Sequence, residues 1–277
     1  MSDVRETDAP SARSGNAPNP PGDFIWYELM TTDAEGAKAF YDAVVGWTIS
    51  EGSPEYGGYR MIGTADGKSA GGVLPLTDEM QQNGARPTWL GYINVPDVDQ
   101  AVAAIEGAEG KALMPAMDIP NVGRIAMVAD PQGAPFYVMK PIPPAGVEKQ
   151  ASDVFSPDAQ QRVSWNELST TDPAAARKFY VDQFGWDTND FMDMGEMGEY
   201  RFLDHHGVRI GALCGVMQGQ QPKWRYYIRV PSIAAAKATA EAKGGTIHMG
   251  PHQVPTGDWI IIGSDPQGAE FALVGGQ

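Results

Sequence analysis

The sequence contains the same stretch twice. A run from Trp26 to Asp33 (WYELMTTD) returns as a run from Trp165 to Asp172 (WNELSTTD). Phe-Tyr and Gly-Trp pairs follow both runs, and each of these residues lies 139 positions from its counterpart. Such a fixed spacing indicates a tandem repeat. We therefore expect the function to lie in what the two copies share and in where they differ.

Length and charge limit the classes of protein that this chain can belong to. Its 277 residues, 42% of them hydrophobic, are enough for two domains with cores of their own. A net charge of −15 excludes nucleic acids and anionic membranes as main partners, because both would be repelled. The sequence contains no stretch of about 18 apolar residues, so it predicts no membrane span. The single cysteine precludes an intramolecular disulfide, which suits a cytoplasmic protein.

Each copy is predicted to consist of two units of the type strand, helix and further strands. In the first copy, a strand at 24–30 leads to Asp33, which caps a helix that ends at Gly46. A second unit starts at 89–95, where Asp97 caps the next helix, and ends with an Asp-Pro-Gln-Gly turn before its last strand. The second copy repeats this order.

The domain boundaries follow from these elements. We expect a disordered tail at 1–22, a domain at 23–140, a proline-containing linker at 141–162 and a second domain at 163–277. One such sheet leaves an apolar face uncovered, and two side by side can curl into a cup. The predicted fold is therefore α+β, with two tandem cup-shaped domains. The pattern leaves open which units pair to close each cup, and whether the protein is a monomer or a homodimer.

The repeat layout resembles the vicinal oxygen chelate superfamily, which includes glyoxalases, bleomycin-resistance proteins and extradiol dioxygenases. The Thr-Thr-Asp helix entries, the Val-Pro-Asp entry at 95–97 and the two Asp-Pro-Gln-Gly turns carry the resemblance over residues 24–140 and 163–274. It is most similar to a two-domain, glyoxalase-like bacterial branch whose members are often labelled hydroxylases. The resemblance implies paired β-α-β-β-β modules and a divalent metal in the cup.

The resemblance also implies where the metal ligands would stand. They lie seven residues before each helix-entry Asp and seven after the Asp of the Asp-Pro turn. Those positions hold Trp26, Leu90, Tyr137, Trp165, Arg225 and Ala272. None is a good ligand for a divalent metal. We therefore predict no cofactor at the usual position, with a metal held by displaced ligands as the alternative.

Strand alternation predicts a different set of side chains in each cup. If Trp26 faces the cup, Glu28 does so too, because alternate residues of a strand share one face. For the same reason Tyr92 faces the cup if Leu90 does. The second copy has the corresponding residues Trp165, Glu167, Arg225 and Tyr227. A glutamate between aromatic walls loses hydration, which raises its pKa and makes it usable as a base. Glu28 and Glu167 are therefore candidate bases or substrate anchors, with Tyr92 and Tyr227 as hydrogen-bonding acids; alternatively, each glutamate is a paired, buried group.

Further residues are candidates for substrate binding. Arg60 and Arg201 stand in matching Tyr-Arg pairs and would approach the glutamates if they turn inward. Arg225 either attracts an anionic substrate or pairs with Glu167 and closes the second cup. His248 and His252 flank a strand end and, with Glu167, form a candidate two-His-one-carboxylate site; a substrate contact or a place at the rim is the alternative. Trp26, Trp165 and Tyr137 complete the binding set.

Three functions remain open at this point. The first is an enzyme of the lyase, isomerase or hydrolase type that works on a small organic molecule by acid–base steps. The second is a protein that binds and sequesters a planar or hydrophobic small molecule, as bleomycin-resistance proteins do. The third is a metal-dependent lyase or dioxygenase with displaced ligands. The first function requires turnover that depends on the glutamates. The second predicts a bound ligand that stays unchanged, and the third predicts a bound metal.

Overall fold

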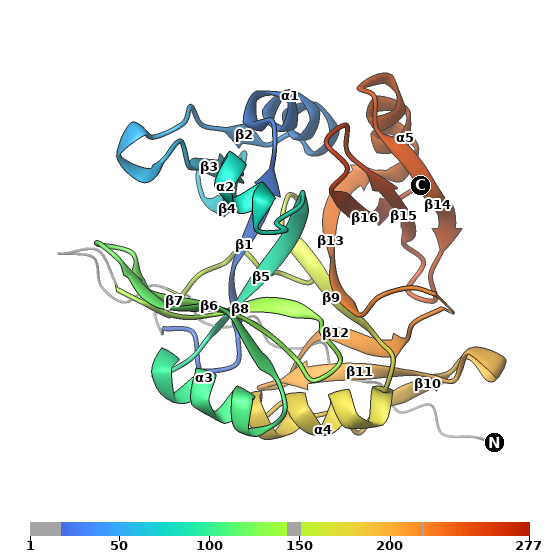
Figure 1. The fold of residues 1–277 in the computed structure, drawn as a ribbon. Helices are drawn as coiled ribbons and strands as arrows, with labels where there is room; N and C mark the ends of the chain where they lie inside the picture. The colour runs from blue at the N-terminus through green and yellow to red at the C-terminus, as the bar shows by residue number, and fades with distance from the viewer. Residues whose placement is uncertain (1–17, 143–150, 218) are drawn as a thin grey trace, which may run out of the picture.

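The computed structural model describes residues 18–142, 151–217 and 219–277. In these residues each copy forms one eight-stranded sheet, and Figure 1 shows the two sheets with helices against them. The predicted α+β class is confirmed. No helix in the described part is long and apolar enough to cross a membrane.

The elements of the first copy follow the predicted order. Its strands are β1 (Phe24–Thr31), β2 (Thr48–Ile49), β3 (Arg60–Gly63), β4 (Ser69–Pro75), β5 (Thr88–Asn94), β6 (Lys111–Ile119), β7 (Gly123–Ala129) and β8 (Pro135–Pro141). Its helices are α1 (Ala34–Val45), α2 (Asp78–Gln82) and α3 (Val98–Gly107), with a 3-10 turn η1 (Pro54–Tyr56).

The second copy has the same order, except that its described residues contain no counterpart of α2. Its strands are β9 (Val163–Thr170), β10 (Phe191–Asp193), β11 (Glu199–His205), β12 (Val208–Gly215), β13 (Lys223–Ser232), β14 (Thr246–Gln253), β15 (Trp259–Ser264) and β16 (Glu270–Gly276). Its helices are α4 (Pro173–Phe184) and α5 (Ile233–Ala242), with a 3-10 turn η2 (Gly195–Met197).

The strand order shows which modules pair. The first sheet has the order β2-β3-β4-β1-β5-β8-β7-β6, and the second has β10-β11-β12-β9-β13-β16-β15-β14. The opening strands of the two modules, β1 and β5, are antiparallel neighbours, and so are β9 and β13. Each sheet is therefore built from the two modules of one copy, which the sequence had left open.

The helix ends follow from the sequence. The Asp33 side chain accepts a hydrogen bond from the Gly36 amide, and α1 ends at Gly46 with φ at 80°. That left-handed conformation favours glycine, which has no Cβ to clash with the chain. Asp172 and Gly185 do the same for α4.

The two copies share one large apolar core. Tyr27 and Leu29 of β1 point into it, as does Tyr226 of β13. The Tyr226 hydroxyl accepts a hydrogen bond of 2.7 Å from the Gly91 amide, and a Cβ at Gly91 would lie 2.9 Å from that hydroxyl. Gly91 thus permits the close approach of the two sheets.

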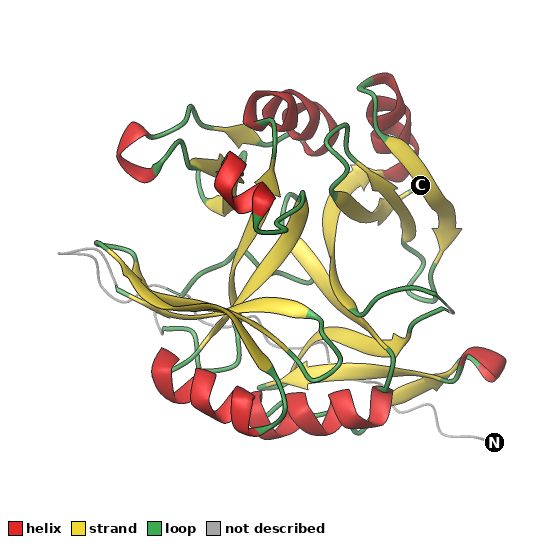
Figure 2. Cartoon of the chain, viewed as in Figure 1, coloured by secondary structure: helices red, strands yellow, loops and turns green. Residues whose placement is uncertain are grey.

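The first helix of each copy, α1 or α4, packs against the other copy. Helix α1 lies beside α5 of the other copy, and α4 lies beside α3, as Figure 2 shows in red. The Tyr41 hydroxyl of α1 donates to Asp265 at 3.0 Å, in the Asp-Pro-Gln-Gly turn of the second copy. Tyr180 of α4 donates to Asp130, in the matching turn of the first copy, at the same distance. Each copy therefore completes the core of the other.

Two predictions about local structure need correction or remain untested. Residues 1–17 of the predicted tail, and 143–150 of the linker, lie outside the described residues. Residues 18–22 are fixed in place, since the Gly22 amide donates to the Asn94 carbonyl at 2.8 Å. The run His205-His206-Gly207 is typical of an exposed hairpin turn, but His205 is buried at the end of β11, with Nε2 2.9 Å from the Pro21 carbonyl oxygen. The turn itself consists of His206, at φ 48°, and Gly207.

Candidate functional site

The face of each sheet that points away from the shared core carries the predicted site. We call the face with Trp26, Glu28, Tyr59, Tyr92 and Tyr137 cup 1. The matching face, cup 2, carries Trp165, Glu167, Tyr200, Arg225 and Tyr227. Strand register places these side chains together, because Trp26 pairs with Tyr92 and Glu28 with Leu90 between β1 and β5. Trp165 pairs with Tyr227, and Glu167 with Arg225, between β9 and β13.

A tryptophan, a tyrosine and a glutamate form the same arrangement in both cups. The Trp26 indole donates to the Tyr59 hydroxyl at 2.8 Å, and the Trp165 indole donates to the Tyr200 hydroxyl at 2.9 Å. In cup 2 the Tyr200 hydroxyl donates in turn to Glu167 at 2.7 Å. Both copies therefore keep a tryptophan that donates to a tyrosine hydroxyl beside the glutamate, and in cup 2 this chain of hydrogen bonds continues to the carboxyl group.

Glu28 of cup 1 is deeply buried. Its exposed fraction is 3%, and its Oε1 atom has no hydrogen-bond partner in the described part of the chain. Burial raises the pKa of Glu28 to about 7, although hydrogen bonding from Tyr92 and Tyr59 acts in the opposite direction. Loss of hydration disfavours the charged carboxylate, and no described cation compensates for that loss. Glu28 can therefore exchange a proton near neutral pH.

The walls of cup 1 are aromatic and apolar. The rings of Tyr92 and Tyr137 stack with centroids 4.2 Å apart, and burial raises the pKa of both hydroxyls. Gly72 lies beside Glu28 in β4, and a Cβ there would stand 2.0 Å from the Tyr59 hydroxyl. A glycine at this place therefore lets Tyr59 reach across β4 to the glutamate.

Four methionines extend the apolar surface of cup 1 along β6, β7 and β8. We call this surface the methionine wing: Met114, Met117, Met127 and Met139. Met114 pairs with Met127, and Met117 pairs with Ile125, which belongs to the apolar cluster of the cup. Met117 is 46% exposed, so the wing reaches the molecular surface. Methionine side chains are flexible and adapt to the shape of a bound molecule.

In cup 2, a network of charged residues surrounds the glutamate. The Arg225 guanidinium donates to Glu167 Oε1 at 2.5 Å and to Glu270 Oε1 at 2.9 Å. Lys223 donates to the other Glu270 oxygen at 2.6 Å, and Tyr227 lies 3.3 Å from Glu167. Of the two alternatives for Arg225, the structure therefore shows pairing with Glu167.

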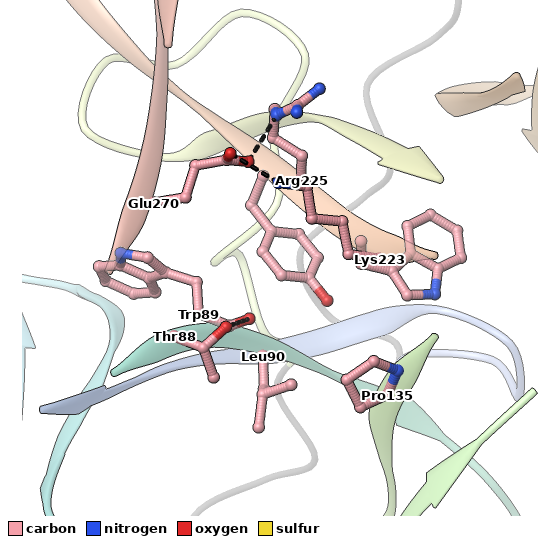
Figure 3. Close-up of a pocket in the computed structure, with 9 residues that line it drawn as sticks. Thr88, Trp89, Leu90, Pro135, Lys223, Arg225 and Glu270 are labelled. Atoms are coloured by element: carbon pink, nitrogen blue, oxygen red, sulfur yellow. Dashed lines mark hydrogen bonds and ion pairs between the residues drawn. The ribbon is translucent and has the colours of Figure 1, made fainter. Parts of the chain in front are cut away.

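The first copy lacks every charge of this network. Lys223, Arg225 and Glu270 correspond, 135 positions earlier, to Thr88, Leu90 and Pro135. All six line a cavity of about 50 Å³ between the copies, where Figure 3 shows Glu270 bonded to the two cations. The two cups therefore share aromatic residues and a glutamate but differ in the partner of that glutamate.

The predicted approach of Arg60 and Arg201 to the glutamates is wrong. Arg60 pairs with Glu35 of α1 at 2.5 Å, and Arg201 pairs with Glu199 and donates to the Thr188 carbonyl at 2.8 Å. Alternation explains the error, because Tyr59 faces the cup and its neighbour Arg60 must face away. Tyr59 and Tyr200 are the site residues that sequence reasoning missed. The matching Tyr-Arg pairs contained that signal.

The two histidines lie on the exposed strand β14. His248 Nε2 is 2.7 Å from the Ser264 hydroxyl, and His252 pairs in register with Ile260. In the described residues no group of three His, Cys, Asp or Glu side chains could hold a metal. The structure therefore does not assemble the two-His-one-carboxylate site with Glu167.

The family's usual metal positions fail a test of donor chemistry. Trp26, Leu90 and Tyr137 do converge on cup 1, where they pack in one apolar cluster. In cup 2, Trp165 and Ala272 also pack together, and Arg225 is bonded to two carboxylates. An indole, two aliphatic groups and a guanidinium are not metal donors, and a phenol with a strongly raised pKa is a poor one. These positions do not fit the metal.

Comparison with known proteins agrees with this architecture. The profile of the Glyoxalase/Bleomycin resistance protein/Dioxygenase superfamily matches residues 24–138 and 162–273. The protein CFP32 of Mycobacterium bovis, named provisionally as a glyoxylase, is 31% identical over 254 residues, which are 90% of this chain and 93% of that protein. The anthracycline biosynthesis protein DnrV of Streptomyces peucetius is 29% identical over 265 residues, 92% of this chain and 93% of the relative.

A solved structure shows the same fold. The Mn(II)-bound glyoxalase of Novosphingobium aromaticivorans superimposes with a TM-score of 0.60 at 17% identity, over 92% of this chain and 82% of that one. At this level of identity the similarity concerns the fold alone. Since the family profile matches both copies, the chain belongs to the Glyoxalase/Bleomycin resistance protein/Dioxygenase superfamily, with one matching region in each copy.

Proposed function

We propose that the protein acts on a small organic molecule in cup 1, by proton transfer of the lyase or isomerase type, with Glu28 as the proton acceptor. The observation that carries the proposal is the buried Glu28 carboxyl, whose Oε1 has no described partner and whose pKa lies near 7. A base works best when its pKa is close to the working pH. Tyr59 and Tyr92 flank it as protonated hydroxyls.

The proposed step is a simple exchange. The substrate gives a proton to the Glu28 carboxylate and keeps the electron pair, and the protonated Glu28 returns the proton to another position of the same substrate. A tyrosine hydroxyl donates a hydrogen bond to the developing oxyanion. The side chains at the family's usual metal positions supply no metal ligand to this step, because they are not suitable donors. Cup 2 has a structural role here, since Arg225 holds Glu167 in an ion pair.

Exchange of substrate hydrogen with solvent tests this proposal. A pool of small metabolites is incubated with the protein in D2O, and mass spectrometry identifies the compound that gains deuterium. We expect Glu28→Gln to reduce the incorporation about a hundredfold or more, because general base catalysis contributes roughly 10²–10⁴-fold. Glu167→Gln is the matched control, because it makes the same chemical change in the other cup.

Two results would contradict the proposal. One is full incorporation in the Glu28→Gln variant. The other is a loss that occurs only in Glu167→Gln, in a variant whose circular dichroism shows a folded protein. The second result would move the site to cup 2.

The methionine wing favours a second candidate, a protein that binds and sequesters its ligand without changing it. Methionine-rich surfaces adapt to several apolar shapes and supply no reactive group. In that case the compound retained by the protein during gel filtration would be recovered unchanged and without deuterium.

A further inference from the structure

Cup 2 shows how this arrangement of residues accommodates a positive charge. The Arg225 guanidinium reaches Glu167 Oε1 at 2.5 Å, between β9 and β13. The side chains of Arg225 and Glu167 are only 13% and 12% exposed. The same guanidinium is also bonded to Glu270 at 2.9 Å, so one tryptophan, two tyrosines and one glutamate accommodate a buried cation here together with a second carboxylate.

Cup 1 has the same tryptophan, two tyrosines and glutamate, but Leu90 and Pro135 stand in place of Arg225 and Glu270. Leu90 stands at the position of Arg225, and it pairs with Glu28 in register as Arg225 pairs with Glu167. No described Lys or Arg forms an ion pair or hydrogen bond with Glu28, and Arg60 of β3, which β4 separates from β1, is bonded to Glu35 instead. The titratable groups that interact with Glu28 are Tyr59, Tyr92 and Tyr137, which burial keeps uncharged.

We propose that cup 1 binds an organic cation, an amine attached to a flat apolar skeleton, whose charged group takes beside Glu28 the place that the Arg225 guanidinium takes beside Glu167. This inference rests on the proposed function, because it requires cup 1 to be the ligand site. It concerns the class of molecule that is recognised, and it applies to both a reacting and a sequestered ligand.

The aromatic residues around Glu28 favour a cation as well. Trp26 is half-buried and lies in the same apolar cluster as Tyr92 and Tyr137. The faces of such rings attract ammonium groups, and the attraction becomes stronger when the cation is desolvated. A buried carboxylate among aromatic rings is therefore suited to an amine.

The rest of the cup suits the skeleton of such a molecule. The methionine wing offers flexible apolar side chains, and Met61 of β3, paired with Gly72 beside Glu28, is 45% exposed. These side chains can move aside to admit a ligand to Glu28. The net charge of −15 raises the local concentration of cations and lowers that of anions.

Three naphthalene compounds of nearly equal shape test the charge preference. They are 2-naphthylmethylamine, which is a cation at pH 8, the neutral 2-naphthylmethanol and the anion 2-naphthoate. Isothermal titration calorimetry on the full chain at pH 8 and low salt measures their affinities. We expect the amine to bind with one site per chain and at least about tenfold more tightly than the alcohol, with 2-naphthoate the weakest.

Variants assign that preference to Glu28. Glu28→Gln is nearly isosteric, and we expect it to abolish the difference between amine and alcohol. Leu90→Arg supplies an internal guanidinium and should prevent binding of the amine. Glu106→Gln is the matched control, because it removes the same charge from the exposed surface of α3 and should leave all three affinities unchanged.

Each other outcome overturns the inference. Equal affinities for amine and alcohol, tighter binding of 2-naphthoate, or no binding of the amine at millimolar concentration would show that cup 1 does not select cations. If Glu28→Gln then still weakens the neutral compound or still stops deuterium exchange, the proposed function stands without the charge preference. If Glu28→Gln changes neither binding nor exchange, both proposals fail.

Discussion

Cup 1 and cup 2 descend from the same sequence and keep the same tryptophan, tyrosine and glutamate, yet their glutamates are in opposite situations. Glu167 has an arginine and two tyrosines as partners, and Arg225 is itself fixed by Glu270. Among the described residues Glu28 has only tyrosines as partners, and one of its oxygens has none. Three substitutions on matching strands (Thr88, Leu90 and Pro135 in place of Lys223, Arg225 and Glu270) account for the difference.

The comparison teaches that in this fold the neighbours of a buried carboxyl group decide its role. A buried carboxylate next to a guanidinium is stabilised as a charge and strengthens the structure, whereas one among apolar groups is held as an acid near neutral pH. The duplication has allowed one copy to retain a structural ion pair while the other retains an uncompensated carboxyl. Four experiments can break or sharpen this contrast.

The largest effect is expected from Arg225→Leu, which gives cup 2 the residue of cup 1. Removal of one partner from a buried ion pair leaves an uncompensated charge, so we expect the free energy of unfolding at pH 7 to fall by about 3–5 kcal/mol. Urea unfolding followed by circular dichroism measures the change. A loss below about 1 kcal/mol would mean that the network is no more than a surface salt bridge.

The next effect concerns pH. The Glu28 pKa is raised from 4.5 to about 7, so the folded state binds this proton more tightly than the unfolded chain does. Its contribution to stability is full below about pH 4.5 and is lost as the pH rises to about 7, by roughly 3 kcal/mol at most. Urea unfolding at pH 5 and pH 8 should show this loss in the wild type.

A glutamine at position 28 should abolish that dependence. Glu28→Gln cannot ionise, so its stability should change less than that of the wild type between pH 5 and pH 8, and it should exceed the wild type at pH 8. Glu106→Gln, on the surface, serves as the control. Parallel pH profiles for all three proteins would show that Glu28 does not titrate in this window.

Leu90→Arg performs the reverse exchange and gives cup 1 the ion pair of cup 2. A guanidinium within about 4–6 Å lowers a carboxyl pKa by about 1–3 units. We therefore expect Glu28 to titrate well below 7, and isotope-edited infrared spectroscopy of the carboxyl group measures this directly. A Glu28 pKa still near 7 in a folded Leu90→Arg protein would refute the claim that position 90 decides the role of the glutamate.

The smallest effect is expected from removal of the matching tyrosine hydroxyls. Tyr200→Phe takes a 2.7 Å hydrogen bond from a carboxylate held in an ion pair, so it should cost about 1.5–3 kcal/mol of stability. Tyr59→Phe should cost less at neutral pH, about 1 kcal/mol, and should raise the Glu28 pKa further because Tyr59 lowers it. Urea unfolding measures both losses, and a larger loss of unfolding free energy in Tyr59→Phe than in Tyr200→Phe would contradict this expectation.

Strand alternation predicts much of the candidate site from the sequence, whereas contacts between strands far apart in the chain cannot be predicted in this way. The inward direction of Trp26 and Glu28 followed from the two-residue period of a strand, and the same period placed Tyr92 opposite them. The same two-residue period, extended from β3 to Tyr59 just before it, turns Tyr59 inward and Arg60 outward. The Lys223–Glu270 contact was not predictable in this way, because it joins β13 to β16, and the register between these strands is a property of the folded sheet.

The sequence by itself determined the duplication, the order of the modules, the helix caps at Asp33 and Asp172 and the unsuitability of the six family positions for a metal. These features depend on residue type and local spacing, which the chain carries explicitly. Tertiary structure alone decided that α1 and α4 pack across the copies, that Arg225 pairs with Glu167 and that none of the described cations bonds to Glu28. Those outcomes depend on distances between residues far apart in the chain, which are fixed only when the sheets and their shared core form.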